Sequence, residues 1–254
     1  MKPLSELNAE KIRAVFSDLD DTLTDHSQIR SETFAALSRL RAKGLRIVIV
    51  SGRPAGWADC LMRLWPVDAM VFENGAGVMT RAGDRVITTC LAVEMDRALQ
   101  VKRLKQIFET AQGKIPKLKL ATDQLYRLFD YAIDYAEEEP RLSEEELAHL
   151  LRLLGEFSDI TYKVSSIHIN YWCGTHTKVT ACDHLLKQWG DVAQENVLYV
   201  GDSPNDEPLF HSFKCSVGVA NVSRFLSQMK FHPAFITPSP GGRGFQEIVD
   251  KIAP

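Results

Sequence analysis

The chain has 254 residues, of which 45% are hydrophobic and 25% are charged, and its formal net charge is -3. This composition is typical of a globular protein with a large core, and nothing in it indicates the clustered basic face that nucleic-acid binding requires. No stretch approaches the roughly 20 apolar residues of a membrane span, and the charged N-terminus lacks the apolar segment of a signal peptide. We therefore expect a cytoplasmic protein that binds neither nucleic acid nor membranes and exists as a monomer or small homo-oligomer.

The cysteines are odd in number and scattered, and no two of them form a Cys-x-x-Cys pair. They are Cys60, Cys90, Cys173, Cys182 and Cys215. This pattern argues against a disulfide scaffold and against a zinc site. Reduced thiols are the expectation.

In the first third of the chain, short apolar runs alternate with a helical pattern. The runs are Ala14–Phe16, Leu45–Val50 and Ala69–Phe72, and a helix is expected from Ser31, as its cap, to Gly44. Such alternation is typical of an α/β fold with a parallel sheet.

The middle of the chain has a different pattern. Apolar residues recur at helical spacing over 101–111, with Gly113 as the expected stop, and Ser143 with Glu146 forms a capping box before a second helix. Extended segments are expected at Leu125–Tyr135, Ile160–Val164 and Ser166–Trp172. In the last of these, Ile167, Ile169 and Tyr171 alternate with His168, Asn170 and Trp172, as in a half-exposed strand.

After Lys178 the first pattern resumes, with a helix that ends at Gly190 and strands at Asn196–Val200 and Cys215–Val219. A last helix carries Phe245, Ile248, Val249 and Ile252. We therefore predict a Rossmann-like α/β core with a parallel sheet, formed by residues 1–81 and 173–254. Residues 82–172 would form an inserted α+β cap domain.

Polar residues stand where three of the predicted core strands end. They are the segments Asp18–Thr22, Ser51–Arg53 and Gly201–Asp206. Open α/β sheets bind ligands at the carboxyl ends of their strands, so these segments should converge. Carboxylates crowded in this way repel one another unless one is protonated or a cation is present, and oxygen ligands favour Mg²⁺.

Groups that could hold an anion lie beside these carboxylates. Ser51 and the Gly52 N–H stand where a strand enters a helix, and Lys178 stands just before another helix. Each pattern alone is common in loops, caps and surfaces. Their occurrence together, in order, and each at a strand end or a helix start, indicates phosphoryl transfer.

Four motifs in this order resemble those of the haloacid-dehalogenase-like (HAD) hydrolase superfamily. They are Asp18-Leu19-Asp20-Asp21-Thr22-Leu23, Ser51-Gly52-Arg53, Lys178, and Gly201-Asp202-Ser203-Pro204-Asn205-Asp206. The inserted domain between the second and third motifs is similar to the subgroup with a large α/β cap, which includes sucrose-phosphate and mannosyl-3-phosphoglycerate phosphatases. The segment Glu73–Ala76 also resembles this subgroup, whereas Asp21 and Val179 stand where many relatives have glycine.

The resemblance implies a role for each motif residue. Asp18 would attack phosphorus and become an aspartyl-phosphate, and Asp20 would act as general acid and then as general base. The Mg²⁺ contacts would come from the Asp18 carboxylate, the Asp20 carbonyl and Asp202, with Asp206 as a further ligand or a contact through water. The phosphoryl oxygens would be held by Ser51, Gly52, Lys178 and Asn205. Dehalogenases of the superfamily lack an acid at the position of Asp20, so phosphate-ester hydrolysis is favoured.

The candidates for substrate recognition are Arg53, Arg127, His168, Asn170 and His176. For Arg127 and Asp130, ordinary surface pairing across strands is the favoured interpretation. His168 and Asn170 face either solvent or the substrate.

We expect a Mg²⁺-dependent phosphatase acting on a small phosphorylated metabolite, with a sugar phosphate as the favoured class. The alternatives are a phosphotransferase or mutase, and a catalytically silent binding protein.

Overall fold

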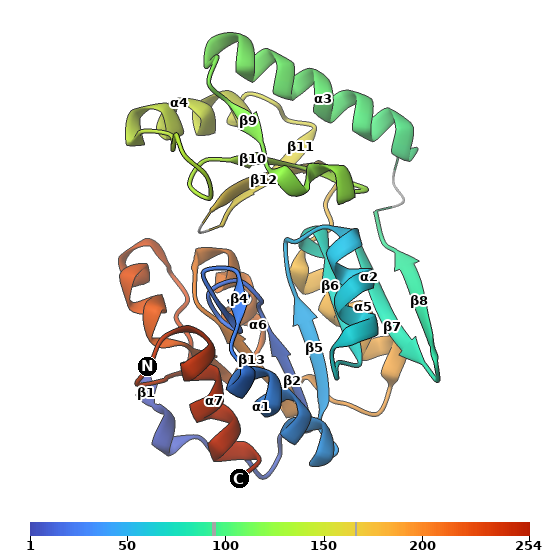
Figure 1. The fold of residues 1–254 in the computed structure, drawn as a ribbon, viewed down its shortest axis with the longest axis vertical. Helices are drawn as coiled ribbons and strands as arrows, with labels where there is room; N and C mark the ends of the chain where they lie inside the picture. Colours follow the sequence, from blue (N-terminus) through green and yellow to red (C-terminus); the bar gives the residue numbers. More distant parts are fainter. Residues whose placement is uncertain (93–94, 166) are drawn as a thin grey trace.

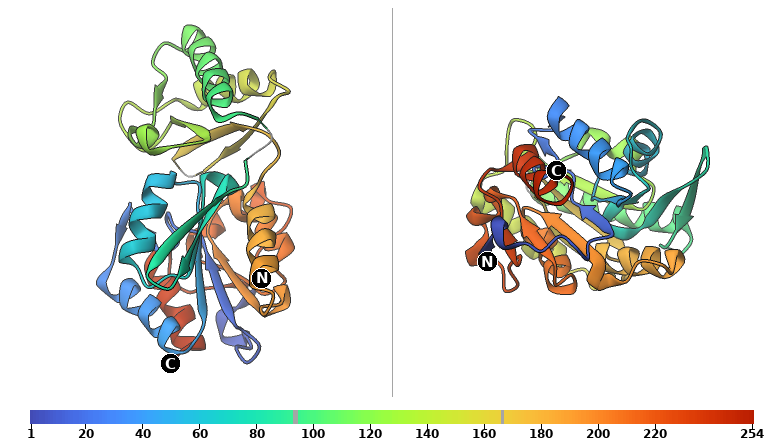
Figure 2. Two further views of the ribbon diagram at one scale, coloured as in Figure 1. Left: turned by 90° about the vertical axis from the view of Figure 1, so that its right-hand side faces the viewer. Right: turned by 90° about the horizontal axis from the view of Figure 1, so that it is seen from below.

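The computed structural model describes residues 1–92, 95–165 and 167–254, and it consists of a core and a cap that lie end to end (Figure 1). The chain enters the cap after β8 and leaves it after β12, so the core is built from both ends of the sequence (Figure 2).

Within the described residues, nine strands form the core sheet in the order β1-β15-β14-β13-β2-β5-β6-β7-β8. Their bounds are β1 Lys2–Pro3, β2 Ala14–Ser17, β5 Arg46–Val50, β6 Ala69–Phe72, β7 Gly77–Ala82, β8 Arg85–Cys90, β13 Val197–Gly201, β14 Ser216–Gly218 and β15 Phe235–Ile236. Pairing is parallel from β1 to β6 and antiparallel at β7 and β8. Figure 1 shows that β2, β5 and β13 point their carboxyl ends toward the cap, as the strand-end prediction requires.

Core helices cover both faces of this sheet. They are α1 Ser31–Ala42, α2 Ala55–Leu64, α5 Lys178–Trp189, α6 Glu207–Ser212 and α7 Gly241–Ile252. Side chains of α1, α2 and α7 pack with Val15, Ile47 and Ile49 on one face, and side chains of α5 and α6 pack with Phe16 and Val48 on the other. Both faces of the central strands are therefore buried, which explains their continuous apolar runs.

The core sheet extends beyond residue 82, the position where the sequence pattern predicted the start of the cap. Strand β8 pairs with β7 along its whole length, from Gly77 with Cys90 to Ala82 with Arg85. A tight turn at Gly83, with φ +60°, joins the two strands. The two-residue connection keeps β8 next to β7, so these residues extend the core sheet.

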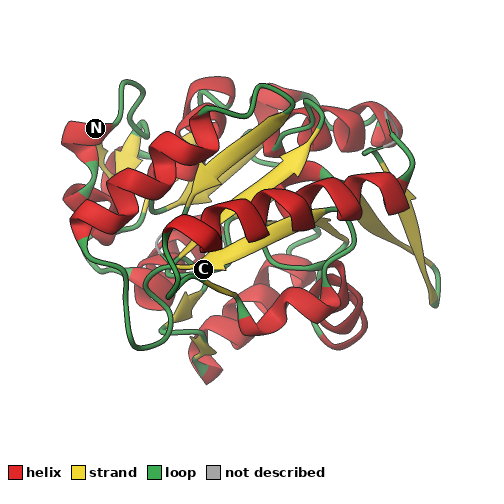
Figure 3. Cartoon of the chain, turned by 90° about the horizontal axis from the view of Figure 1, so that it is seen from above, coloured by secondary structure: helices red, strands yellow, loops and turns green. Residues whose placement is uncertain are grey.

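In the described part of the cap, four strands form an antiparallel sheet in the order β11-β12-β10-β9, with helices on one face. Its elements are α3 Arg97–Lys114, β9 Lys119–Leu120, the 3₁₀ turn η3 Thr122–Tyr126, β10 Asp130–Asp134, α4 Glu144–Gly155, β11 Ile160–Val164 and β12 His168–Cys173. Leu104 of α3 and Leu150 of α4 pack with Ile133, Ile169 and Tyr171 of the sheet. From above, these two helices lie in front of the cap strands, so the opposite face of the sheet is directed at the core (Figure 3).

Three local predictions for the cap need correction. Helix α3 passes through Gly113 and ends at Lys114, because a glycine inside a helix costs only about 1 kcal/mol. The segment expected to be extended from Leu125 begins inside η3, and only Asp130–Asp134 is a strand.

The third correction concerns β12. All six of its residues are buried, since one face packs on the helices and the other faces the core. The start we expected, Ser166, lies outside the described residues. The capping box of Ser143 and Glu146 is present.

Two further short strands, β3 Thr24–Asp25 and β4 Gln28–Ile29, form a hairpin just after the first motif. Within the described residues, no helix is both long enough and apolar enough to cross a lipid bilayer.

Candidate active site

Adjacent parallel strands bring the motif residues together. Strand β2 lies between β13 and β5, so Asp18, Asp202 and Ser51 follow three neighbouring strand ends. The Asp18 N–H donates to the Val200 carbonyl at 2.9 Å, which extends the ladder by one residue and holds the Asp18 backbone. Gly201 leaves room for the fourth motif, because a Cβ there would lie 2.6 Å from a carboxylate oxygen of Asp206.

Three carboxylates meet at this edge. Asp18, Asp202 and Asp206 are all buried, and each offers an oxygen within 4.8 Å of the others. Burial raises the pKa of Asp18 to about 8, against the lowering effect of Lys178. Burial, together with Asp206 and Asp18, also raises the pKa of Asp202. The raised pKa values of Asp18 and Asp202 fit a bound cation, since a divalent ion would keep these two carboxylates ionised.

Lys178 supplies positive charge at this cluster. Its Nζ donates to Asp18 Oδ1 at 2.7 Å and to Asp206 Oδ1 at 3.3 Å. Burial lowers the pKa of Lys178, but Asp18 and Asp206 outweigh this effect and raise it above its usual value. Lys178 is the first residue of α5, whose N-terminus is fixed by a capping box of Thr177 and Thr180.

Asp206 and Asp202 are held by different groups. Asp206 Oδ2 accepts the N–H groups of Asp202 and Ser203, and its Oδ1 accepts the Tyr199 hydroxyl at 2.6 Å. Asp202 accepts the Thr22 hydroxyl on one oxygen and the side-chain amide of Asn221 on the other. Sequence reasoning missed Tyr199 and Asn221. In the sequence, Tyr199 lies inside a buried apolar strand and Asn221 lies outside all four motifs, so neither stood out.

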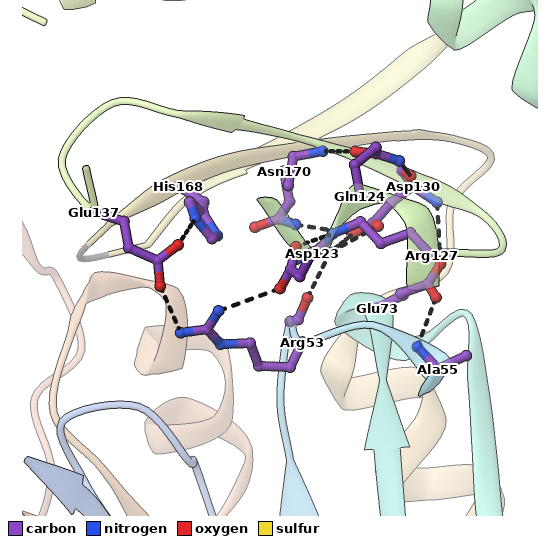
Figure 4. Close-up of polar contacts among 12 residues, drawn as sticks. Arg53, Ala55, Glu73, Asp123, Gln124, Arg127, Asp130, Glu137, His168 and Asn170 are labelled. Carbon is purple, nitrogen blue, oxygen red and sulfur yellow. Dashed lines mark hydrogen bonds and ion pairs between the residues drawn. The ribbon is translucent and has the colours of Figure 1, made fainter. Parts of the chain in front are cut away.

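The general-acid candidate Asp20 faces Arg53. The Arg53 Nε lies 3.0 Å from Asp20 Oδ2, and its Nη2 lies 2.9 Å from Asp20 Oδ1. The same guanidinium contacts Asp123 Oδ2 and Glu137 Oε1 of the cap, each at 3.2 Å (Figure 4). It also lies over the Trp57 ring. Burial lowers the pKa of Arg53, but Asp20 outweighs it and raises this pKa. Arg53 therefore joins the acid candidate of the core to two carboxylates of the cap.

The remaining phosphate-site candidates lie around a small cavity. Ser51 Oγ accepts the Arg53 N–H at 3.0 Å, and Asn205 Oδ1 accepts the Ser203 hydroxyl at 2.6 Å. The cavity is about 20 Å³ in volume, and its lining includes Asp18, Asp20, Ser51, Gly52, Arg53, Asn74, Arg127, His168, Asn170 and Asn205. Core motifs and cap candidates thus meet at one place.

Arg127 and Asp130 are paired, but the expectation that they pair at the surface is wrong. Their side chains are fully buried, and Arg127 Nη1 lies 2.9 Å from Asp130 Oδ1. Arg127 also pairs with Asp123 and donates to the Gly52 carbonyl of the core at 2.9 Å. The cap sheet closes over the core here, so a pair that the sequence places on an exposed strand is enclosed between two domains.

Glu73 forms a second contact between core and cap. Its carboxylate accepts the N–H of Ala55 in the core and the N–H groups of Leu128, Phe129 and Asp130 in the cap. Burial, followed by the nearby Asp130, raises the pKa of Glu73 to about 7. The motif Glu73–Ala76 marked this position, but the backbone partners only come together in the folded chain.

The other cap candidates separate into two groups. His168 and Asn170 face the cavity: His168 Nε2 lies 2.7 Å from Glu137 Oε2, and the Asn170 amide donates to Asp130 Oδ2 at 3.0 Å (Figure 4). His176 lies elsewhere. Its ring stacks on Trp172, and it lines a separate cavity with Gln100.

Comparison with known proteins agrees with this fold. A protein of Thermoplasma acidophilum has a structure that matches with a TM-score of 0.75 at 17% identity, over 95% of this chain and 98% of the other. A haloacid dehalogenase-like hydrolase from Bacteroides thetaiotaomicron matches with a TM-score of 0.67 at 18% identity, over 95% and 99% of the two chains. The core and cap together therefore have the fold of the HAD-like hydrolases.

The sequence itself matches a family model. The model of sucrose-6F-phosphate phosphohydrolase covers residues 12–235, so the chain belongs to this family of HAD-like hydrolases. The phosphoglycolate phosphatase of Nitrosopumilus maritimus is 27% identical over 247 residues, which is 96% of this chain and 97% of that protein. The expected resemblance is confirmed, and the protein is an enzyme of the HAD-like phosphatase class.

Proposed function

We propose that this enzyme hydrolyses a small phosphate monoester with Mg²⁺, through a covalent aspartyl-phosphate on Asp18. The observation that carries the proposal is the buried group of Asp18, Asp202, Asp206 and Lys178, with Asp20 at the same strand end. This arrangement combines a nucleophile, an acid and concentrated charge, which phosphoryl transfer requires.

The carboxylates of Asp18 and Asp202 and the carbonyl of Asp20 would hold Mg²⁺. Asp206, bonded through both of its oxygens, would fix the position of Lys178 and of the loop after β13. When bound, Mg²⁺ supplies positive charge to the phosphoryl oxygens.

Asp18 would form a bond to phosphorus as the ester oxygen leaves, and Asp20 would give that oxygen its proton. Asp20 would then take a proton from the water that attacks phosphorus, and Asp18 would be released with inorganic phosphate. Arg53 positions the Asp20 carboxylate. Ser51, the Gly52 N–H, Asn205 and Lys178 would hold the phosphoryl oxygens.

The cavity favours a small alcohol. With the cap in this position, about 20 Å³ is free beside Asp18, whereas a pocket of about 530 Å³ adjoins it on the side of Asp202 and Glu137. A two-carbon ester such as phosphoglycolate, which is named for the Nitrosopumilus maritimus relative, needs the least displacement. A sugar phosphate is the second candidate, and it would extend into the wider pocket.

The test is phosphate release from phosphoglycolate, short sugar phosphates and p-nitrophenyl phosphate, with and without Mg²⁺. We expect Mg²⁺-dependent release that Asp18→Asn abolishes, with one mole of alcohol formed per mole of phosphate. Transfer to a second alcohol without net phosphate release would instead support a phosphotransferase. No turnover of any ester by folded, Mg²⁺-binding protein would contradict the proposal.

A further inference from the structure

A carboxylate of the cap lies across two groups that line the reaction cavity. Glu137, in the loop after β10, places Oε1 3.2 Å from Arg53 Nη2 and Oε2 2.7 Å from His168 Nε2 (Figure 4). Arg53 and His168 line the cavity beside Asp18, whereas Glu137 lines the wider pocket next to it. Glu137 therefore binds Arg53 and His168 from the side of the wider pocket, into which we expect the leaving group to extend.

Glu137 and Asp20 are the two more exposed of the three carboxylates on Arg53. The Glu137 side chain is 25% exposed, compared with 23% for Asp20 and 7% for Asp123, whereas Arg53 and His168 are each 3% exposed. Arg53 and His168 are thus enclosed, whereas Glu137, which bridges them, borders the wider pocket.

The Glu137 backbone is held independently of its carboxylate. Its N–H donates to Asp134 Oδ1 at 2.8 Å, and Ala136 and Glu138 donate to the same Asp134 carboxylate. The side chain can therefore rotate away while the loop keeps its conformation. The pocket of about 530 Å³ that would receive it is lined by Arg141 and Arg224 and also by four aspartates, Asp20, Asp21, Asp25 and Asp202. The two arginines are the partners that it offers to a displaced carboxylate.

Substrate binding requires some movement of side chains around this cavity or of the cap. A volume of about 20 Å³ holds about one water molecule, so a phosphate ester does not fit beside Asp18 while every side chain stays in place. If Glu137 leaves, Arg53 Nη2 keeps Asp20 but loses one of its carboxylate partners, and His168 Nε2 loses the Glu137 carboxylate. A buried donor without an acceptor is costly. A carboxylate on the leaving group can restore both contacts, whereas a neutral alcohol cannot restore the charge-assisted pairing.

We propose that Glu137 is a displaceable occupant of the leaving-group subsite, and that Arg53 and His168 thereby select phosphate esters whose alcohol carries a carboxylate. The inference rests on the proposed function, because it assigns the subsite next to the same Asp18. It makes Glu137 a specificity residue that competes with the substrate for two fixed partners.

The experiment compares phosphoglycolate with ethyl phosphate, two esters of two-carbon alcohols that differ in the carboxylate. The measured quantity is the ratio of their kcat/KM values in the wild-type enzyme, Glu137→Ala, His168→Ala and the control Glu138→Ala. We expect Glu137→Ala to raise the ratio about fivefold through a lower KM for phosphoglycolate, and His168→Ala to lower it about tenfold. Glu138 pairs with Lys119 at the surface, so its removal should leave the ratio unchanged.

A ratio unchanged in Glu137→Ala, or an equal loss of activity on both esters, would overturn the inference, since Glu137 would then only hold the cap closed. Turnover of p-nitrophenyl phosphate tests the core chemistry separately. If that ester is hydrolysed and the ratio does not respond, the inference fails while the proposed function stands. Calorimetric binding of both esters to Asp18→Asn, with and without Glu137→Ala, gives the same comparison without turnover: the ratio of Kd values must favour phosphoglycolate more strongly when Glu137 is absent.

Discussion

The buried carboxylates of the core and of the cap differ in how they are paired. At the core strand ends, Asp18, Asp202 and Asp206 lie together and Lys178 contacts two of them, Asp18 and Asp206, so negative charge is in excess. On the cap side, Arg127 is enclosed by Asp123 and Asp130, and its remaining donor binds a core carbonyl. The core group therefore fits a further cation. In the cap group, Asp123 pairs with Arg53 as well as Arg127, and Asp130 pairs with Arg127 and Asn170, so the protein itself supplies the partners. The comparison suggests that the first site performs chemistry and the second holds two domains in register.

The largest expected effect is on the core site. Asp18→Asn should lower kcat by at least about 10³-fold, because loss of a nucleophile removes the covalent route. Phosphate release under saturating ester measures it. Asp84→Asn, in the exposed turn between β7 and β8, is the matched control and should retain wild-type activity. Comparable activity in the two variants would remove Asp18 from the mechanism.

The next largest effect is expected from the removal of Arg127. Arg127→Met should reduce the free energy of unfolding by about 3–5 kcal/mol, because Asp123 and Asp130 would stay buried without their partner. Denaturant unfolding measures the loss. Arg103→Met breaks an exposed pair with Asp159 and should cost at most about 1 kcal/mol. Equal losses in the two variants would show that burial between the domains adds nothing to the Arg127 pairs.

The pH dependence of the free energy of unfolding should show the contribution of Glu73. Its pKa is raised from 4.5 to about 7 in the folded protein, so the folded state binds a proton more tightly than the unfolded chain. The stability that this group contributes is complete below pH 4.5 and is lost as pH rises through 7, by up to about 3 kcal/mol. Glu73→Gln should flatten this part of the curve of unfolding free energy against pH. An unaltered curve would assign the dependence to other groups.

Mg²⁺ should stabilise the protein as well as activate it. At a Mg²⁺ concentration of about 100 times Kd, the ion would add about 2.7 kcal/mol to the free energy of unfolding. Each kcal/mol would raise Tm by about 2–4 °C. Asp202→Asn should abolish the shift, whereas Arg127→Met should retain it if the two charge groups are separate. Thermal unfolding with and without Mg²⁺ checks both, and a shift that persists in Asp202→Asn would place the ion elsewhere.

Much of the core was predictable from short segments. Buried parallel strands have continuous apolar runs, and their polar ends meet because neighbouring strands run in the same direction. The grouping of Asp18, Ser51 and Asp202 therefore follows from the sequence alone. The capping box at Ser143 was readable for a similar reason, since both of its partners lie within one helical turn.

The contacts between core and cap depended on the tertiary structure. Arg53 meets Asp123 and Glu137, which are 70 and 84 residues away in the chain. The alternation in β12 correctly separated its two faces, but only the closed cap turns His168 toward a buried cavity instead of solvent. Periodicity reports which residues share a face, and it carries no information on what covers that face. By itself the sequence determined the strand ends and their chemistry, while the packing of two domains decided which charges are buried together, because that depends on partners far apart in the chain.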